Sequence, residues 1–240
     1  MFLSEWRPIP VWKDPPPEPL LIRGQVHIWY WDFHHIRDFE QYIAWISSDE
    51  RARLTRFKTE ESKRNFLGSH IFLRRVLSLY LNTYPSSIAF ESVTQGKPQV
   101  AEPVLKDKLE FNLSHCHQRV LCAVARVTQV GIDIERVVAD LYDERTAKLV
   151  FSEVELAVLR GLEPADRSEA FIRGWTRKEA YAKCLGGGIS DNLKDVELSL
   201  TLFASSSSGV DVRTFYCPDG YIGSVAATSS ASEYFFFKWK

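Results

Sequence analysis

The chain has 240 residues, of which 45% are hydrophobic and 25% are charged, as expected for a globular protein with a substantial core. The 30 Lys and Arg side chains nearly balance the 31 Asp and Glu side chains, which argues against a general polyanion-binding protein but allows a local basic patch. The four cysteines have no CxxC spacing, and no apolar run is long enough to cross a bilayer. These features predict a cytoplasmic protein with reduced thiols, without a zinc site or a membrane span.

The first half of the sequence predicts an extended lead-in, strands and one long helix. Residues 1–19 are rich in proline, which favours an extended or poorly ordered segment. Residues 25–31 are β-branched and aromatic and predict a strand. After a short helix at residues 39–46, residues 47–50 are typical of the N-terminal cap of a helix. Apolar residues then recur at helical spacing through residues 62–81, which predicts a core helix.

Basic side chains gather around the start of this long helix. They are Arg51, Arg53, Arg56, Lys58, Lys63 and Arg64, followed by Arg74 and Arg75. One interpretation is the solvated face of a core helix. The other is a phosphate-binding patch, because guanidinium groups match phosphate geometry with paired hydrogen bonds. Lys97, in the Gly-Pro turn at residues 94–98, is either a solvated side chain or a further anion contact.

Residues 109–113 and 120–127 predict two strands, and the Ser-His-Cys-His sequence at residues 114–117 predicts a loop between them. His115 and His117 are only two residues apart, which does not suit a zinc pair on a helix. A polar histidine in such a loop is either structural or lies where a pocket opens between the strands, and both interpretations stay open.

The Val-Gly-Ile-Asp-Ile-Glu sequence at residues 130–135 predicts a strand with a polar face. Alternation directs its branched apolar residues to one side and projects Asp133 and Glu135 together from the other. Neighbouring carboxylates repel each other unless water solvates both or a cation lies between them. The pair is therefore either a solvent-facing strand edge or part of a cation site. Gly131 has no side chain, so that backbone or a ligand can approach closely there.

The remaining sequence predicts two further helices and three strands. The helices span residues 141–162, with a possible break at residues 151–152, and residues 168–184, where three glycines follow. The strands are expected at residues 210–216, 221–227 and 234–239. Residues 221–227 faintly echo residues 120–125, which hints at two similar halves.

The last helix contains the sequence Trp-Thr-Arg-Lys-Glu-Ala-Tyr-Ala-Lys at residues 175–183. Glu179 and Lys183 are four residues apart and share one face, as in many solvated helix pairs. Together with Asp133 and Glu135, however, Glu179 completes a set of three hard oxygen ligands from two rigid elements. Such a set suits Mg²⁺, or Mn²⁺, with room for water and a substrate phosphate. With Lys178 and Lys183 nearby, it predicts substitution at the phosphorus of a phosphate-bearing substrate.

Residues 130–135 and 175–183 resemble the two signature motifs of the 4′-phosphopantetheinyl transferases. Residues 111–115 and 96–98 are similar to two further motifs of that family, in the same order. The chain length resembles the surfactin-synthetase-activating (Sfp) type. This resemblance implies an α+β monomer with two similar halves related by a pseudo-twofold axis, each a small, mainly antiparallel sheet packed with helices, and with the active site in the cleft between them.

The same resemblance assigns roles to the two halves. Residues 20–127 would form the N-terminal half, which contacts the adenosine and phosphates of coenzyme A (CoA), and residues 128–240 the C-terminal half, with the metal site and the catalytic helix. The enzyme would transfer 4′-phosphopantetheine from CoA to a serine hydroxyl of an apo acyl or peptidyl carrier protein, as holo-[acyl-carrier-protein] synthases do. The reaction would depend on Mg²⁺ and release 3′,5′-ADP.

The resemblance also implies the residues of the active site. Asp133, Glu135 and Glu179 would hold the metal ion. Glu179, or a water molecule that it orients, would act as the general base, and Lys183 would neutralise or protonate the leaving phosphate. Contacts to CoA would come from Arg53, Arg56, Arg64, Lys97, Ser114, His115, Lys178 and Lys183.

Two other functions are weighed against this one. A non-catalytic CoA- or nucleotide-binding module would need the basic patch and the loop, but not three carboxylates. A nucleic-acid-binding domain could use the basic residues 51–75 together with the many aromatic side chains, although the near-neutral charge argues against it. We therefore expect CoA and a carrier protein as partners, and no nucleic acid.

Overall fold

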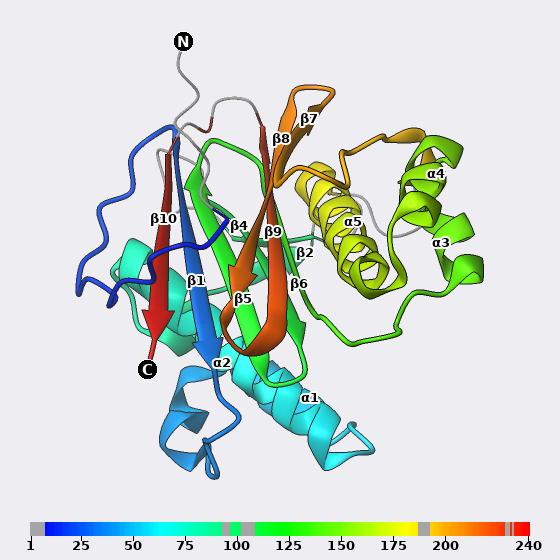
Figure 1. Cartoon of the computed structure of the whole chain (residues 1–240). Coiled ribbons are helices and arrows are strands. Elements are labelled where there is room, and N and C mark those ends of the chain that lie inside the picture. Colours follow the sequence, from blue (N-terminus) through cyan, green and yellow to red (C-terminus); the bar gives the residue numbers. More distant parts are fainter. Residues whose placement is uncertain (1–7, 93–96, 102–108, 187–192, 229–230, 232) are drawn as a thin grey trace.

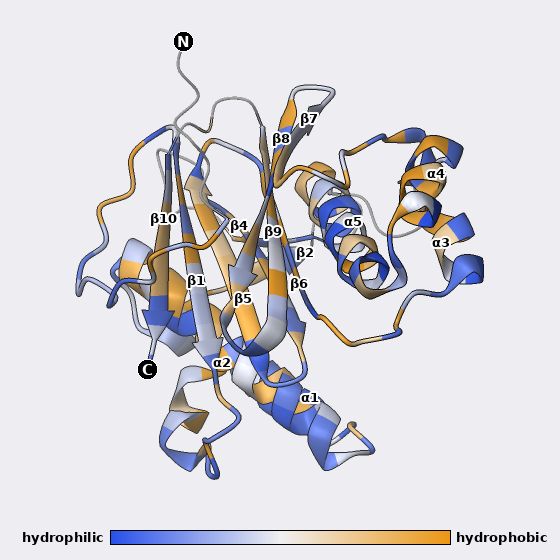
Figure 2. Ribbon diagram, viewed as in Figure 1, coloured by the Kyte–Doolittle hydropathy of each residue, from blue (hydrophilic) through white to orange (hydrophobic). Residues whose placement is uncertain are grey.

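The computed structural model describes residues 8–92, 97–101, 109–186, 193–228, 231 and 233–240. Among these residues the chain forms two four-stranded sheets and a small two-stranded one. The larger sheets lie side by side in the middle of the molecule, and each half of the chain contributes one long helix (Figure 1). Figure 2 shows that hydrophobic residues are concentrated along the central strands. None of the described helices has both the length and the apolar character needed to cross a bilayer.

The first sheet has the strand order β10-β1-β5-β4, and the second has the order β6-β9-β8-β7. The first half of the chain contains β1 (Gln25–Asp32), η1 (Glu40–Trp45), α1 (Ser48–Leu54), α2 (Glu60–Leu81), η2 (Pro85–Ser87), β2 (Phe90–Ser92), β3 (Pro98–Val100), β4 (Leu109–Cys116) and β5 (Arg119–Arg126). The second half contains β6 (Val130–Arg136), α3 (Glu144–Val150), α4 (Glu153–Gly161), α5 (Pro164–Leu185), η3 (Leu193–Asp195), β7 (Ala204–Ser207), β8 (Val210–Cys217), η4 (Pro218–Gly220), β9 (Tyr221–Thr228) and β10 (Glu233–Trp239).

The two halves repeat one topology, which confirms the predicted α+β fold with similar halves. In the first half, β1 leads into the 22-residue helix α2, and β5 then pairs antiparallel with both β1 and β4. In the second half, β6 leads towards the 22-residue helix α5, and β9 pairs antiparallel with both β6 and β8. The faint sequence echo between residues 120–125 and 221–227 thus falls on the two equivalent central strands, β5 and β9.

The last strand departs from the expected division at residues 127 and 128. Strand β10 returns to the first sheet and pairs parallel with β1, from Gln25 opposite Glu233 to Trp31 opposite Trp239. The pairing is stabilised by aromatic packing, because the rings of Trp31 and Trp239 lie 4.8 Å apart. The second half of the sequence therefore completes the sheet of the first half.

Most predicted elements appear close to their expected bounds. Ser47 caps α1 and Ser152 caps α4 through a capping box, and the cap at Ser152 explains the break at residues 151–152. The prediction of a loop at residues 114–117 is wrong for Ser114–Cys116, because β4 stays paired with β5 as far as Cys116 opposite Arg119. The chain turns only at His117, which has φ 53°. The Gly-Pro turn predicted at residues 94–98 lies largely outside the described residues.

The described part of the proline-rich lead-in, residues 8–19, packs on both sheets. The Pro8 carbonyl accepts a hydrogen bond from Tyr216 N of β8 at 2.7 Å. Lys13 N donates to the Phe236 carbonyl of β10 at 3.0 Å. Between them, the Trp12 ring lies 5.3 Å from the Tyr30 ring of β1. The segment therefore ties the two sheets together on one side.

The buried His27 of β1 makes the stability of the fold depend on pH. Trp29 Nε1 donates to the Tyr80 hydroxyl at 2.7 Å, and that hydroxyl lies 2.8 Å from His27 Nδ1, which can accept its proton. Burial lowers the pKa of His27 from 6.5 to about 4. The unfolded chain therefore binds this proton at a higher pH than the folded chain, so the free energy of unfolding falls as the pH drops from 6.5 towards 4.

We expect His27 to account for a loss of roughly 2 kcal/mol in the free energy of unfolding between pH 7 and pH 5. Urea unfolding of the wild type and of His27→Gln at both pH values measures it. The variant, which cannot titrate at this position, should lose roughly 2 kcal/mol less than the wild type over the same interval. Equal losses in the two proteins would contradict the assignment.

Candidate active site

Strands β4 and β6 meet where the two halves of the chain touch. They belong to different sheets, and a row of polar side chains on β4 bridges them. Asn112 Oδ1 accepts a hydrogen bond from Ile132 N at 2.9 Å, and Ser114 Oγ donates to Asp133 Oδ1 at 2.8 Å. Alternate residues of a strand point to one face, so this row follows from the period of β4. It fixes the β6 carboxylates relative to the first half.

Two more contacts extend this row in both directions. Cys116 Sγ donates to Glu135 Oε2 at 3.2 Å, next to the bond between Ser114 and Asp133. At the other end, Lys97 Nζ donates to the Val130 carbonyl at 2.8 Å. Residue numbers rise in the same direction along both strands, so β4 and β6 run parallel to each other. Lys97, Ser114, Asp133 and Glu135 had been given roles from the sequence, whereas Asn112 and Cys116 had not, although the alternation along β4 could have revealed them.

Helix α5 crosses β6 with its backbone in direct contact, because Gly131 has no side chain. A Cβ atom placed on Gly131 would lie 2.0 Å from the Ala180 carbonyl oxygen and 2.4 Å from Cys184 N. This close approach brings Glu179 and Lys183, which share a face of α5, next to Asp133. The predicted importance of the glycine is thus explained by packing between helix and strand.

Asp133, Glu135, Glu179 and Lys183 form what we call the carboxylate–lysine cluster. Lys183 Nζ lies 2.6 Å from Asp133 Oδ1 and 3.2 Å from Ser114 Oγ. Asp133 is 3% exposed and Glu179 is 7% exposed. Within the described part of the chain, Asp133 Oδ2 and Glu179 Oε1 are buried without a hydrogen-bond partner. A buried oxygen without a partner is costly, which points to a ligand at these atoms.

The electrostatics of this cluster favour a bound cation. Burial raises the pKa of Asp133, while the Lys183 ammonium and the Ser114 hydroxyl act in the opposite direction. Burial, and then the charge of Asp133, raise the pKa of both Glu135 and Glu179. The three carboxylates therefore disfavour one another's ionised forms, and the single ammonium of Lys183 cannot compensate all of them.

The residues fit a hard divalent cation in chemistry, although their carboxyl groups are not gathered into one compact set. Among the described residues, no three His, Cys, Asp or Glu side chains are gathered closely enough to hold a metal ion together. The Lys183 ammonium instead pairs with Asp133. The two partnerless oxygens, on Asp133 and Glu179, are nevertheless hard donors of the kind that Mg²⁺ takes from proteins.

Comparison with known proteins decides the family. Residues 129–220 match the 4′-phosphopantetheinyl transferase superfamily, and residues 31–127 match the N-terminal family of 4′-phosphopantetheinyl transferases. The 4′-phosphopantetheinyl transferase HetI of Nostoc sp. is 37% identical over 193 residues, which cover 79% of this chain and 80% of HetI. The chain belongs to the 4′-phosphopantetheinyl transferase superfamily.

A second curated relative supports the same assignment. The 4′-phosphopantetheinyl transferase Sfp of Bacillus subtilis is 29% identical over 196 residues, covering 78% of this chain and 84% of Sfp. A solved holo-[acyl-carrier-protein] synthase of Thermotoga maritima matches 42% of this chain and 63% of its own, with 23% identity and a TM-score of 0.31. On the family matches and the two curated relatives, the protein is a 4′-phosphopantetheinyl transferase, an enzyme that transfers phosphopantetheine from CoA to carrier proteins.

Ser114 and His115 of the transferase lie next to the cluster, on the last residues of β4. The Ser114 hydroxyl is within hydrogen-bonding distance of both Asp133 and Lys183. His115 follows Ser114 on β4, and desolvation by the surrounding protein, followed by the charge of Lys183, lowers its pKa. Their contacts with CoA stay a prediction.

Lys178 is not available for the predicted phosphate contact. Its side chain is fully buried, and its ammonium lies 2.6 Å from Glu155 Oε2 and donates to the carbonyls of Leu193 and Val196 at 2.7 and 2.9 Å. The residue before Glu179 on a helix points about 100° away from it. Lys178 therefore faces α4 and η3, while Glu179 faces β6.

The basic residues around α2 serve the fold more than the sequence suggested. The Arg64 guanidinium donates to the backbone carbonyls of Phe33, His34 and Ile36, and so holds the segment after β1. Arg74 is buried, and its Nε donates to Glu50 at 2.6 Å. These contacts agree with the interpretation of a core helix. The other basic side chains near the start of α2 stay exposed, namely Arg51, Arg53, Arg56 and Lys58.

Arg53 and Arg56 lie on the exposed side of this region, and their contact with CoA stays a prediction. The Arg53 guanidinium lies over the Phe66 ring, 5.2 Å from its centre. Lys97, by contrast, is bound by the Val130 carbonyl and lies 3.8 Å from Glu110. It therefore helps to connect the two halves of the chain, and its contact with CoA stays a prediction.

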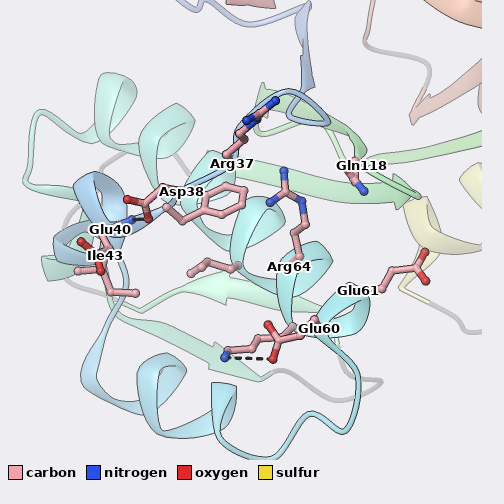
Figure 3. Close-up of a pocket in the computed structure, with 11 residues that line it drawn as sticks. Arg37, Asp38, Glu40, Ile43, Glu60, Glu61, Arg64 and Gln118 are labelled. Carbon is pink, nitrogen blue, oxygen red and sulfur yellow. Dashed lines mark hydrogen bonds and ion pairs between the residues drawn. The ribbon is translucent and has the colours of Figure 1, made fainter.

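A pocket of about 980 Å³ opens beside α2 in the first half, away from the three carboxylates. Figure 3 shows Arg64 rising from α2 into it, with Arg37 and Gln118 at its rim. It is lined by Arg37, Asp38, Phe39, Glu40, Ile43, Glu60, Glu61, Lys63, Arg64, Leu67 and Gln118. Its lining includes three basic and four acidic side chains, so its charge favours no single class of ligand.

Proposed function

We propose that the transferase is a Mg²⁺-dependent enzyme in which the carboxylate–lysine cluster carries the chemistry. It would transfer 4′-phosphopantetheine from CoA to a serine hydroxyl of an apo acyl or peptidyl carrier protein and release 3′,5′-ADP. The observation that supports this most directly is the buried pair of partnerless oxygens on Asp133 and Glu179, beside the Lys183 ammonium.

Asp133, Glu135 and Glu179 are the residues that would hold the metal ion. Bound there, Mg²⁺, or Mn²⁺ in its place, would neutralise the CoA pyrophosphate and the charge that grows on the leaving group. Ser114 and Cys116 would hold the oxygens of Asp133 and Glu135 in place through the bonds described above. Loading the site requires Lys183 to turn from Asp133 towards the phosphates, which its 28% exposed side chain allows.

Glu179 would accept the proton of the attacking serine hydroxyl, directly or through a water molecule. Burial and the charge of Asp133 raise the pKa of Glu179, which makes it a better proton acceptor than an exposed carboxylate. The serine oxygen would then bond to the β-phosphorus while the bond from that phosphorus to the bridging oxygen breaks. Lys183 would stabilise or protonate the released phosphate oxygen. Because one chain supplies both sides of the cluster, we further propose that a monomer is active.

The deciding experiment incubates the transferase with CoA, Mg²⁺ and an apo acyl carrier protein and measures the intact mass of the carrier. We expect one phosphopantetheine to be added and an equal amount of 3′,5′-ADP to appear. EDTA should abolish the transfer, Mg²⁺ should restore it, and Zn²⁺ should not restore it fully, because the donor set is made of hard oxygens. Transfer that persists after chelation would contradict the metal assignment. Stable CoA binding without transfer would favour the non-catalytic binding module.

A further inference from the structure

Every hydrogen of the buried Lys178 ammonium has an acceptor inside the second half of the chain. The acceptors are Glu155 Oε2, the Leu193 carbonyl and the Val196 carbonyl, all between 2.6 and 2.9 Å away. The ammonium also lies 5.3 Å from the centre of the Phe151 ring. An ammonium has three donors and no more, so none is left for a phosphate of CoA.

The Glu155 carboxylate is also buried and hydrogen-bonded on both oxygens. It is 4% exposed, and its Oε2 accepts a hydrogen bond from Ser152 N at 2.9 Å as part of the capping box of α4. Its Oε1 accepts from Leu198 N at 2.9 Å. The ion pair therefore joins α5 to the first turn of α4 and to the segment after η3. Such a fully bonded pair is rigid, and removing one partner leaves a buried charge alone.

The position of this pair on α5 determines what it can control. Gly131 lets α5 lie on β6, and the side chains of Thr176 and Arg177 hydrogen-bond to β9 and β8. The ion pair holds α5 from another side, about 100° away from Glu179, and so adds resistance to rotation of the helix about its axis. A carboxylate at the outer radius of a helix moves by about 1 Å when the helix turns by about 10°. A misplacement of about 1 Å can cost a factor of about 100 in rate.

We propose that Lys178 and Glu155 are a positioning pair that fixes the rotation of α5 and thereby directs the Glu179 carboxylate towards Asp133 and Glu135. This inference rests on the proposed transfer chemistry for its link to rate. It assigns Lys178 to the placement of Glu179 and removes it from the groups that touch CoA. It also gives a role to Glu155, which lies on another helix and outside the motifs that identify the family.

The test compares Lys178→Met, Glu155→Gln and the double variant with the wild type. Glutamine keeps the acceptor that the capping box needs, so Glu155→Gln is the milder change and carries the test if Lys178→Met does not fold. Lys148→Met serves as the matched control, since Lys148 forms an exposed ion pair with Glu144 on α3. For each protein we would measure kcat, the dissociation constant of CoA, the dissociation constant of Mn²⁺ in the presence of CoA, and thermal unfolding.

We expect both single variants to lower kcat by about 10- to 100-fold and to weaken Mn²⁺ binding, while the CoA dissociation constant changes by less than about twofold. The kcat of the double variant should be no lower than the kcat of the less active single variant, because both changes remove the same interaction. Lys148→Met should match the wild type. The Mn²⁺ measurement does not depend on transfer. If the wild type shows no transfer, the proposed function is refuted, but the Mn²⁺ affinities of the variants still test the positioning pair.

Two results would overturn the positioning pair. If Lys178→Met raises the CoA dissociation constant about tenfold while Glu155→Gln behaves like the wild type, Lys178 binds phosphate directly. If the folded variants keep both wild-type kcat and wild-type Mn²⁺ affinity, the pair contributes only to stability.

Discussion

Glu179→Gln is expected to reduce kcat for phosphopantetheine transfer by about 100- to 10,000-fold, while CoA binding is largely retained. Glutamine has nearly the same shape as glutamate but can neither accept the serine proton nor offer a charged oxygen to the metal ion. Glu179 supplies one of the two buried, partnerless oxygens of the cluster, so its loss is not compensated by a neighbour. Transfer is measured by the mass of the carrier protein, and CoA binding by calorimetry.

Glu163→Gln is the matched control for this change. Glu163 precedes the same helix, is exposed, and makes no side-chain cap contact. We expect it to transfer at the wild-type rate. Near wild-type transfer by Glu179→Gln would remove this residue from the mechanism, and a large loss of CoA affinity would mean that its main role is to bind substrate.

Without metal, Glu179→Gln should unfold at the same temperature as the wild type or at a higher one. Burial and the charge of Asp133 raise the pKa of Glu179, which means that the folded protein holds this carboxylate at a cost. Removing the charge removes that cost at neutral pH.

Gly131→Ala is expected to lower the free energy of unfolding by about 3 kcal/mol or more and to abolish transfer. The added Cβ would lie 2.0 Å from the Ala180 carbonyl oxygen, 2.4 Å from Cys184 N and 2.9 Å from Cys184 Cα, all of them atoms of the α5 backbone. No side-chain rotation can relieve these contacts, so α5 must move away from β6. That movement would also separate Glu179 from Asp133.

Gly161→Ala provides the comparison, because a Cβ at Gly161, the last residue of α4, would meet nothing within 4 Å. We expect Gly161→Ala to be neutral or slightly stabilising, since alanine restricts the unfolded chain more than glycine does. Chemical unfolding and the transfer assay measure both variants. If Gly131→Ala is as stable and as active as Gly161→Ala, the close packing of α5 on β6 does not determine the site.

The contacts along β4 explain why the two halves act as one enzyme. Asn112 binds the backbone of β6, and Ser114 and Cys116 bind the carboxylates of Asp133 and Glu135. In a single sheet, backbone hydrogen bonds would have fixed the register of these strands. Here the side chains of one strand do so, and each bond also orients a residue of the cluster.

The sequence determined the local structure and the chemistry of the site. Periodicity predicted most helices and strands because the spacing of apolar residues directly reflects which side of an element is buried. The alternation at residues 130–135 placed Asp133 and Glu135 on one face, and the helical spacing placed Glu179 and Lys183 on another. These are properties of neighbours along the chain, and such properties can be read without the tertiary fold.

Only the tertiary structure decided which charged side chains reach the site and which support it. Lys178 and Lys183 are the same residue type on one helix, but Lys183 meets Asp133 whereas Lys178 is enclosed by Glu155 and two backbone carbonyls. Likewise, Arg64 binds carbonyl groups after β1, and β10 crosses back to the first sheet. Helical spacing puts the two lysines on different faces of α5, but the partner of each charge is set by elements that are distant in sequence, so the sequence alone did not show which lysine is enclosed.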